Sequence, residues 1–465
     1  MPRVLIVTYQ WLPMFNVGVK HVATLCRYLP QAGWEPHILT KDWSEGPALE
    51  DAPWGMTWEP TAQSPALELA ESLPVTRTTA QRRDNRWLRW HDRLVATELA
   101  ARAWTATGMA RRALQYAYPF YGDVPDLHRG WAEQSVTAGL ATVRQYGIGA
   151  VVSVCPAPSA HILGGEIARR AGIPWVAMFD TLHTFDHGIG DGRSRRARWG
   201  SRLQTRHWLR GASRTACISP RMSEFVRDEY GVAGDVITVS YDPDERRVAP
   251  HRVPGSPMRV THMGTIDLAR QNVEPLLEAL DSLVADAGSG SSLGERLTVE
   301  LIGSQSEDRL ADLLRGRPCE SLVTVRARVS PAEAIRLQRE SDVLLTFNRA
   351  PGALAERAAS PGYPAKMFEH WNAQRPTISI GMEHDGYAAA LWRDSGAGEV
   401  AENATMVRVL LQHFLDELHR DGKIAFKGDE TTIARHAAPE QARRLGALLD
   451  QASAERFGSW QRARR

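Results

Sequence analysis

The stretch "RVLIVTYQWLPMFNVGVKHVATLCRYLPQAGWEPHILT", residues 3–40, decides the fold of the N-terminal half. It opens on a short apolar, β-branched run, which is typical of a strand buried on both faces. In residues 20–33 apolar side chains recur at helical spacing, and Gly33 stands where a helix cap is expected. The letters "PHILT" then resume an apolar run. The stretch predicts a strand, a helix and a strand, the first unit of an open parallel α/β sheet.

The same alternation returns twice along the chain. Strand-like runs at 149–156, 173–180 and 214–219 extend the first sheet, and a second series begins near residue 258. The segment 242–257 is rich in Pro and charge without apolar periodicity, which is typical of a linker. We therefore predict two doubly wound, Rossmann-like domains. The predicted bounds are 1–250 and 258–435, with a C-terminal helix at 436–465 that packs back on the N-terminal domain.

The bulk composition sets limits on function. A chain of 465 residues exceeds what one core usually organises. The formal net charge of +2 gives no global field that would favour nucleic acid. The four cysteines form no CxxC pair, which fits a reducing compartment. No run approaches the roughly 20 apolar residues of a membrane span. A cytoplasmic protein is predicted, with peripheral contact to the inner face of a membrane as an option.

An insertion at about 44–135 interrupts the α/β rhythm with a helical, basic, Trp-rich segment. One interpretation is a helical subdomain whose aromatic side chains pack inward. The other is that the region 82–115 forms a face for an anionic membrane surface or a bulky acceptor. That face would consist of Trp87, Trp90, Arg82, Arg83, Arg86 and Arg89.

Polar groups follow several predicted strands, where open α/β sheets bind their ligands. Gly18 and Lys20 follow the first strand, and Asp180 and His183 follow the run 173–180. Arg270 follows the strand at 258–264. After the strand at 342–348 comes "SPGYPAKMFEHWNAQRPTISIG" (360–381), with charged side chains on the first turns of a helix. Backbone N–H groups around Ala365 and Lys366 there form a natural seat for a diphosphate.

The order of these motifs resembles the GT-B glycosyltransferases, specifically the large retaining family with a paired-Glu motif. The resemblance rests on "GWEPHILT", "GIPWVAMFDTLH", "SYDPDE", "MGTIDLARQN" and "GYPAKMFEHWNAQRPTISIG", and it covers the chain except the insertion. It implies a C-terminal domain that binds a nucleotide-diphosphate sugar, with UDP-sugar favoured over GDP-sugar. It also implies an N-terminal domain that binds the acceptor. The predicted sugar transfer requires no metal ion and no cofactor.

The resemblance assigns Glu369 to the second acid of the family motif, which accepts both ribose hydroxyls of the donor. The first acid would stand at position 361, where this chain has Pro361, so the motif is degenerate; Glu356 is an alternative source of that carboxylate. The other interpretation of Lys366 and Glu369 is an ordinary surface pair. The donor-binding candidates are Gly18, Lys20, Gly264, Thr265, Arg270, Gly362, Tyr363, Ala365, Lys366 and Glu369.

Family members carry an Arg and a Lys after the first strand of the second domain to neutralise the leaving diphosphate. Here the Arg position is Thr265, and Arg270 matches the Lys. We hypothesise that Arg270 and Lys366 together replace that pair. A solvated arginine at a helix start is the alternative for Arg270.

The family also places polar residues of the N-terminal domain against the transferred sugar and the acceptor. Asp180 and His183 match best, and either could hold a sugar hydroxyl or take the acceptor proton. A structural polar loop and a metal site with His187 and Asp186 are the alternatives. The catalytic candidates are Asp180, His183, Arg270 and Lys366.

The predicted activity is transfer of a sugar from a nucleotide-diphosphate sugar to an acceptor hydroxyl, a glycosyltransferase of EC class 2.4, with retention implied by the resemblance. The acceptor is a glycan, a lipid-linked molecule or a small natural product. One alternative is a sugar-nucleotide epimerase with the same fold, which needs no acceptor. The other is a non-catalytic paralogue that binds sugar nucleotide, since the first acid and one cation of the family pattern are missing.

Overall fold

The computed structural model describes most of the chain. The described residues are 1–44, 57–58, 65–79, 128–155, 157–181, 203, 205–232, 234–246, 255–268, 271–287, 293–303, 307–348, 363–382 and 386–463. They fold into two compact units. The first comprises Met1–Pro60, Leu69–Thr238 and Ala442–Arg465, and the second comprises Thr61–Glu68 and Val239–Gln441.

The first unit is built on a seven-stranded sheet in which all neighbouring strands pair in parallel. The strand order is β5 (Val75–Thr78), β3 (Glu35–Lys41), β1 (Arg3–Thr8), β6 (Ile148–Cys155), β7 (Trp175–Phe179), β8 (Arg214–Cys217) and β9 (Gly234–Val236). Every residue of β1 after Arg3 is buried, as expected for a strand covered on both faces. A two-stranded antiparallel pair, β2 (Met14–Phe15) with β4 (Thr57–Trp58), stands apart from this sheet.

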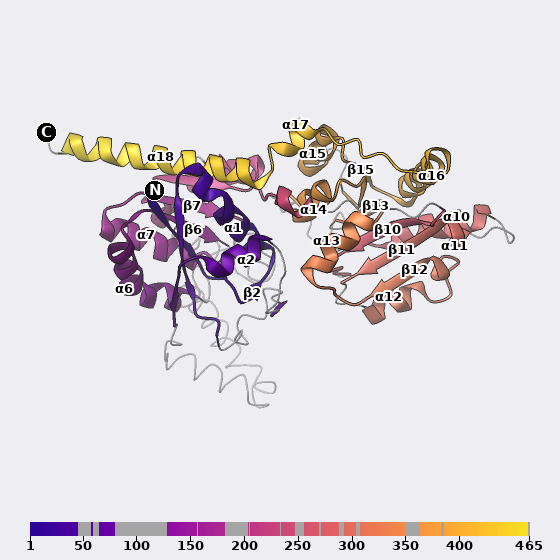
Figure 1. Ribbon diagram of the computed structural model, residues 1–465, viewed down its shortest axis with the longest axis horizontal. Helices are drawn as coiled ribbons and strands as arrows, with labels where there is room; N and C mark the ends of the chain where they lie inside the picture. The colour runs from indigo at the N-terminus through magenta and orange to yellow at the C-terminus, as the bar shows by residue number, and fades with distance from the viewer. Residues whose placement is uncertain are drawn as a thin grey trace, which may run out of the picture. The chain divides into compact units, whose positions relative to one another are not determined.

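Helices cover the first sheet. They are α1 (Val17–Tyr28), the 3-10 turn η1 (Leu29–Ala32), α6 (Arg129–Tyr146), α7 (Ser159–Ala171) and α9 (Pro220–Tyr230). Helices α6 and α7 pack side by side (Figure 1). A short helix, α2 (Pro65–Ser72), contains the division between the two units at Glu68 and Leu69. Helix α18 (Ala438–Ala463) begins in the second unit and belongs to the first from Ala442 onward, where Trp34 Nε1 donates to Asp450 Oδ1 at 3.0 Å.

The second unit contains a six-stranded sheet, also parallel throughout. Its order is β12 (Val323–Arg326), β11 (Leu297–Ile302), β10 (Met258–Met263), β13 (Val343–Phe347), β14 (Thr377–Ile380) and β15 (Gly398–Ala401). The helices are α10 (Glu274–Ala287), α11 (Leu293–Arg296), α12 (Glu307–Leu314), α13 (Pro331–Glu340), α14 (Ala365–Ala373), α15 (Tyr387–Ser395), α16 (Ala404–Asp421) and α17 (Glu430–Ala434), with 3-10 turns η3 (Pro243–Arg246) and η4 (Glu320–Leu322).

Two parallel α/β sheets are thus confirmed, and the elements follow the predicted alternation. Two local interpretations were wrong. The insertion predicted at about 44–135 was interpreted as helical, but Val75–Thr78 within it form β5, an edge strand of the first sheet. The start of the segment interpreted as a linker is ordered within the second unit: Asp242 is fully buried, and its carbonyl accepts a hydrogen bond from Asn372 Nδ2 at 3.0 Å. A single sequence does not reveal this contact, because the two residues are 130 positions apart.

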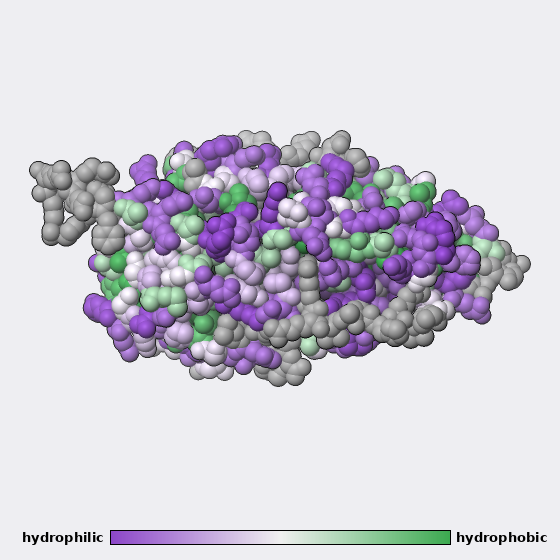
Figure 2. All heavy atoms as spheres, turned by 45° about the horizontal axis from the view of Figure 1, so that its top comes forward, coloured by the Kyte–Doolittle hydropathy of each residue, from purple (hydrophilic) through white to green (hydrophobic). Residues whose placement is uncertain are grey.

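Several predictions fall outside the described residues. They include most of the insertion, with Arg82, Arg83, Arg86, Arg89, Trp87 and Trp90. None of the described helices combines the length and the apolar character that a membrane span requires. On the face drawn in Figure 2, hydrophobic residues are scattered in small groups among hydrophilic ones.

Candidate functional site

The carboxyl edge of the second sheet is shaped by two glycines at successive strand ends. Gly264 follows β10 and Gly303 follows β11, with φ angles of +118° and +90° that L-residues with side chains rarely adopt. Each continues the ladder to its neighbouring strand: Gly264 N donates to Ile302 O at 2.7 Å, and Gly303 N donates to Arg326 O at 3.0 Å. The chain therefore turns sharply just beyond the sheet, where open α/β sheets hold ligands.

Lys366 lies directly over Gly264. An ideal Cβ placed at Gly264 would meet Lys366 Nζ at 2.5 Å and Lys366 Cε at 3.0 Å, so a side chain at this position would force the end of the lysine to shift. Lys366 stands in the first turn of α14, whose N-cap Pro364 contributes no side-chain hydrogen bond. The first N–H groups of a helix have no partner within the helix and attract anions. The ammonium and the helix N-terminus thus converge at the end of β10.

The charge of Lys366 is sensitive to its surroundings. Burial lowers the pKa of Lys366, the nearby Glu369 carboxylate raises it, and the positive charge of Arg328 lowers it. Glu369 lies one helical turn after Lys366 on α14. Arg328, which is exposed, follows β12 at the same edge of the sheet. Among the described residues, Glu369 and Arg328 therefore both lie within electrostatic reach of Lys366.

Two buried histidines lie close to Lys366. His262 Nδ1 bonds the carbonyl oxygen of Leu345 at 3.0 Å, which requires the proton on Nδ1, and His370 Nδ1 lies 3.1 Å from Thr377 Oγ1. The pKa of each is lowered to about 3, mainly by burial; the charge of Lys366 contributes to the lowering in both, and Glu369 opposes it for His370. Both imidazoles are therefore neutral at pH 7. His370, which the sequence places among the charges of the helix start, points into the core.

A tyrosine pair flanks the start of α14. The rings of Tyr363 and Tyr387 stack with centroids 4.9 Å apart, and their hydroxyl oxygens are 2.5 Å apart. Tyr387 is the first residue of α15, so the pair ties the starts of two helices together. Burial raises the pKa of the Tyr363 hydroxyl, which keeps it protonated at neutral pH. The pair fixes the chain just before Lys366.

The first unit has a separate polar cluster at its own carboxyl edge. The Asn16 side chain caps α1 by accepting from Val19 N at 2.9 Å, which fixes the start of the helix that carries Gly18 and Lys20. His21 Nδ1 lies 3.2 Å from Asp180 Oδ2, and the two side chains are only 1% and 8% exposed. Among the described residues, His21 Nε2 and Asp180 Oδ1 have no hydrogen-bond partner.

The structure thus sorts the predicted residues into three groups. It brings together Gly264, Tyr363, Ala365, Lys366 and Glu369 in the second unit, with Thr265 exposed beside Gly264. Gly18, Lys20 and Asp180 lie in the first unit. His183, Arg270 and Gly362 lie outside the described residues, as do Glu356, Pro361, Asp186 and His187. Among the described residues, no group of His, Cys, Asp and Glu side chains could hold a metal ion.

Three residues near these clusters were not predicted. Arg328 could have been found, because it follows a predicted strand on the ligand side of the sheet. His262 could not, since a histidine inside an apolar strand gives no sign of its neighbours. His21 pairs with a residue 159 positions away, a distance across which a single sequence carries no signal.

The two parallel sheets and their strand-end geometry define a class: the fold is GT-B. No protein-family model matches the sequence, and no curated protein matches it. A solved glycosyltransferase from Rickettsia africae ESF-5 is 11% identical and has a TM-score of 0.55 over 99% of this chain and 98% of its own. Anabaena Alr3699/HepE, solved in complex with UDP, is 13% identical with a TM-score of 0.52 over 99% and 100%.

A solved structure that is named for a different reaction also has a similar fold. A putative UDP-N-acetylglucosamine 2-epimerase from Listeria monocytogenes is 9% identical and has a TM-score of 0.50 over 97% of each chain. Identities this low establish similarity of fold alone, so the function must be argued from the residues of this chain.

Proposed function

We propose that the protein is a glycosyltransferase that moves a sugar from a nucleotide-diphosphate sugar, with UDP as the favoured nucleotide, to an acceptor hydroxyl. The observation that carries the proposal is the position of Lys366. Its ammonium lies over Gly264 at the N-terminus of α14, with Glu369 one turn further along the helix. The complex of the Anabaena structure with UDP supports the choice of nucleotide.

Each part of this edge suits one part of the donor. The diphosphate would lie against the N–H groups of the first turn of α14 and the Lys366 ammonium, because both present positive charge to its oxygens. The Glu369 carboxylate would accept hydrogen bonds from the two ribose hydroxyls, since its two oxygens lie in one plane. Gly264 has no side chain, which leaves space for the diphosphate to approach the backbone at the end of β10.

The chemistry that follows is electrostatic. As the bond between the anomeric carbon and the diphosphate oxygen breaks, its electron pair moves to the diphosphate, the acceptor oxygen bonds to the anomeric carbon, and the acceptor proton passes to Asp180 or to the departing diphosphate. Lys366 stabilises that charge, supported by the field of Arg328 and by Arg270. Removing one such group raises the barrier by roughly 3 kcal/mol. If Arg270→Ala left turnover within a few-fold of wild type, the part assigned to Arg270 would be wrong.

In the first unit, Asp180 is proposed to contact the transferred sugar or the acceptor, with His21 holding its carboxylate in place. Asp180 Oδ2 lies within hydrogen-bond distance of His21 Nδ1, and Asp180 Oδ1 has no hydrogen-bond partner among the described residues. The acceptor class is a glycan, a lipid-linked molecule or a small natural product. Retention of configuration follows from the family resemblance and is the proposed outcome.

The experiment that tests the proposal begins with thermal denaturation in the presence of UDP, GDP, ADP and TDP. A ligand that binds only the folded state raises the midpoint, and at a fixed ligand concentration the shift grows with the logarithm of its affinity. We expect UDP to give the largest shift. UDP-sugars are then incubated with the protein alone and with pooled acceptors, and the products are identified by mass spectrometry and NMR.

The three candidate functions give different products. A transferase produces UDP and a glycosylated acceptor whose anomeric configuration NMR reports. A sugar-nucleotide epimerase, which the Listeria match makes the second candidate, produces a new sugar nucleotide without any acceptor. Binding without turnover identifies a non-catalytic paralogue, and absence of any nucleotide shift refutes the proposed site.

A further inference from the structure

A strongly basic run of the sequence belongs to the first unit. Residues 193–214 contain eight arginines and no acidic residue, although the whole chain has a net charge of only +2. The described part of this run includes helical residues 205–209 in the first unit. Leu203, Arg206, His207 and Arg210 are exposed there, whereas Leu209 is buried. Since these exposed residues recur at helical spacing, they share one solvent-facing stripe.

This stripe forms the wall of a cationic pocket of about 530 Å³. Arg206, His207 and Arg210 line it together with Leu203 and Tyr230 at the end of α9, and none of the described lining residues is acidic. Neither Arg206 nor Arg210 forms an ion pair with any described residue. Other arginines of the same unit are paired, as Arg221 is with Glu224 on α9. The pocket therefore holds uncompensated positive charge.

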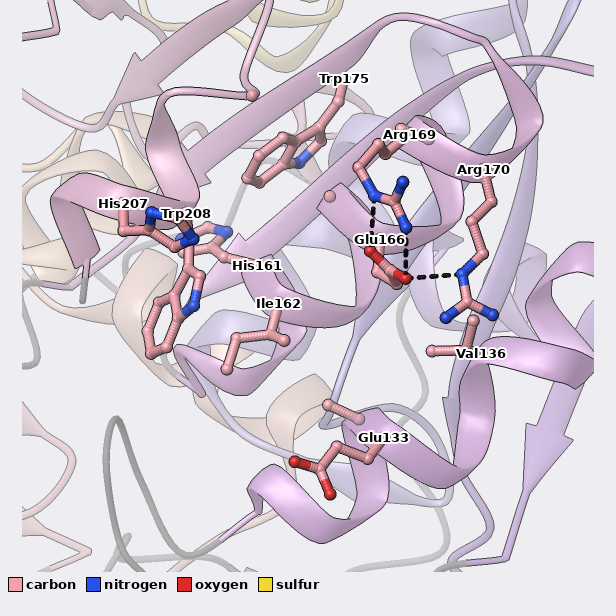
Figure 3. A pocket seen from close by; sticks show the side chains of 14 residues that line it. Glu133, Val136, His161, Ile162, Glu166, Arg169, Arg170, Trp175, His207 and Trp208 are labelled. Carbon is pink, nitrogen blue, oxygen red and sulfur yellow. Dashed lines mark hydrogen bonds and ion pairs between the residues drawn. The ribbon is translucent and has the colours of Figure 1, made fainter. Parts of the chain in front are cut away.

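A second pocket, of about 740 Å³, adjoins the first through their shared residue His207. Figure 3 shows its two sides. Trp208 and Ile162 provide apolar surface, and on the other side Glu166 bridges Arg169 and Arg170 through hydrogen bonds of 2.6 to 2.9 Å. Both acids of the described lining are therefore paired: Glu166 with Arg169 and Arg170, and Glu133 with Arg129 at 3.0 Å. A cationic pocket and a pocket with an apolar wall therefore lie side by side.

We propose that this face binds an anionic phospholipid surface. The lipid phosphate lies between Arg206 and Arg210, and an acyl chain lies against Trp208 and Ile162. Leu203, with 42% of its surface exposed, faces the lipid beside the two arginines. Charge complementarity selects the partner: basic residues beside exposed apolar and Trp side chains match anionic headgroups above an acyl layer. The proposal does not depend on the nucleotide-sugar function.

The test is sedimentation of the full chain with vesicles of phosphatidylcholine alone or with one third phosphatidylglycerol. We expect binding only to the anionic vesicles, weakening as salt rises. Each arginine near an anionic surface contributes about fivefold in affinity, so Arg206→Gln with Arg210→Gln should weaken binding by more than tenfold. The matched control, Arg221→Gln with Arg315→Gln, removes the same charge from two exposed arginines that have acidic partners.

A second measurement tests the acyl contact. Vesicles with brominated acyl chains quench tryptophan fluorescence, and Trp208→Phe should remove part of that quenching while circular dichroism stays unchanged. The proposal is overturned if the Arg206 and Arg210 variant binds as the control does, or if neutral vesicles bind equally well. It is also overturned if glycerol phosphate at low millimolar concentration or an RNA oligonucleotide displaces the protein from the vesicles, because the ligand would then not be the lipid surface.

Discussion

Replacing Gly264 with Ala perturbs the proposed nucleotide site with a single methyl group. The new Cβ would lie 2.5 Å from Lys366 Nζ and 3.0 Å from Lys366 Cε, so the ammonium must move by about 1 Å to reach ordinary contact distance. The φ of +118° adds backbone strain of about 1–3 kcal/mol. We expect lower stability together with weaker nucleotide binding.

The two effects can be separated with a matched variant. Gly316 also has a positive φ, +75°, but a Cβ there would meet nothing within 4 Å. Gly316→Ala therefore introduces strain without touching the site. Displacing a charged hydrogen-bonding group costs roughly 1.5–3 kcal/mol, which corresponds to about 10-fold to 150-fold weaker UDP binding for Gly264→Ala.

The assays are urea denaturation for stability and isothermal titration calorimetry with UDP for binding. Gly316→Ala should lose stability and keep wild-type affinity, whereas Gly264→Ala should lose both. The reasoning is refuted if Gly264→Ala binds UDP as tightly as Gly316→Ala does, because the position of Lys366 would then not matter for the nucleotide.

Three further predictions concern other buried groups. His370 has a pKa lowered from 6.5 to about 3 by burial, so the unfolded chain binds the extra proton between these values and stability falls as pH drops through this window. In His370→Leu the free energy of unfolding should fall less steeply as pH drops, by about 1.4 kcal/mol per pH unit, measured by urea denaturation between pH 6.5 and 4.5. An unchanged dependence of the unfolding free energy on pH would contradict this. His21→Leu should cost about 3–5 kcal/mol because it leaves the buried Asp180 carboxylate uncompensated, and adding Asp180→Asn should recover much of that loss; equal stability of the single and double variants would exclude the coupling. Trp34→Phe removes the hydrogen bond to Asp450 and should lower stability by about 0.5–1.5 kcal/mol, with faster exchange of the amides of α18, which hydrogen exchange would report.

Local pattern was sufficient for most of the architecture. The β-branched run of β1 and the helical spacing behind it predicted a parallel α/β unit, and the strand-end rule placed Lys366 and Glu369 at one edge. These inferences succeed because strand, helix and turn preferences depend on residues that are near one another in sequence.

What the sequence did not predict depends on contacts between distant segments. The packing of Lys366 over Gly264 joins positions 102 residues apart, and the neutral state of His370 follows from burial that no spacing reveals. The fixed position of Asp242 depends likewise on Asn372. Arg328 is different, because the rule that selected Lys366 applies equally to the end of β12.

Calorimetric titration of UDP into wild type, Lys366→Met and Glu369→Gln tests the central claim most directly. Lys423→Met, which removes an exposed lysine of the same unit, is the control. We predict measurable binding by wild type and the control, at least tenfold weaker binding by each of the other two, and a loss for Glu369→Gln that disappears when 2′,3′-dideoxy-UDP replaces UDP. Wild-type affinity in Lys366→Met would contradict the proposed site.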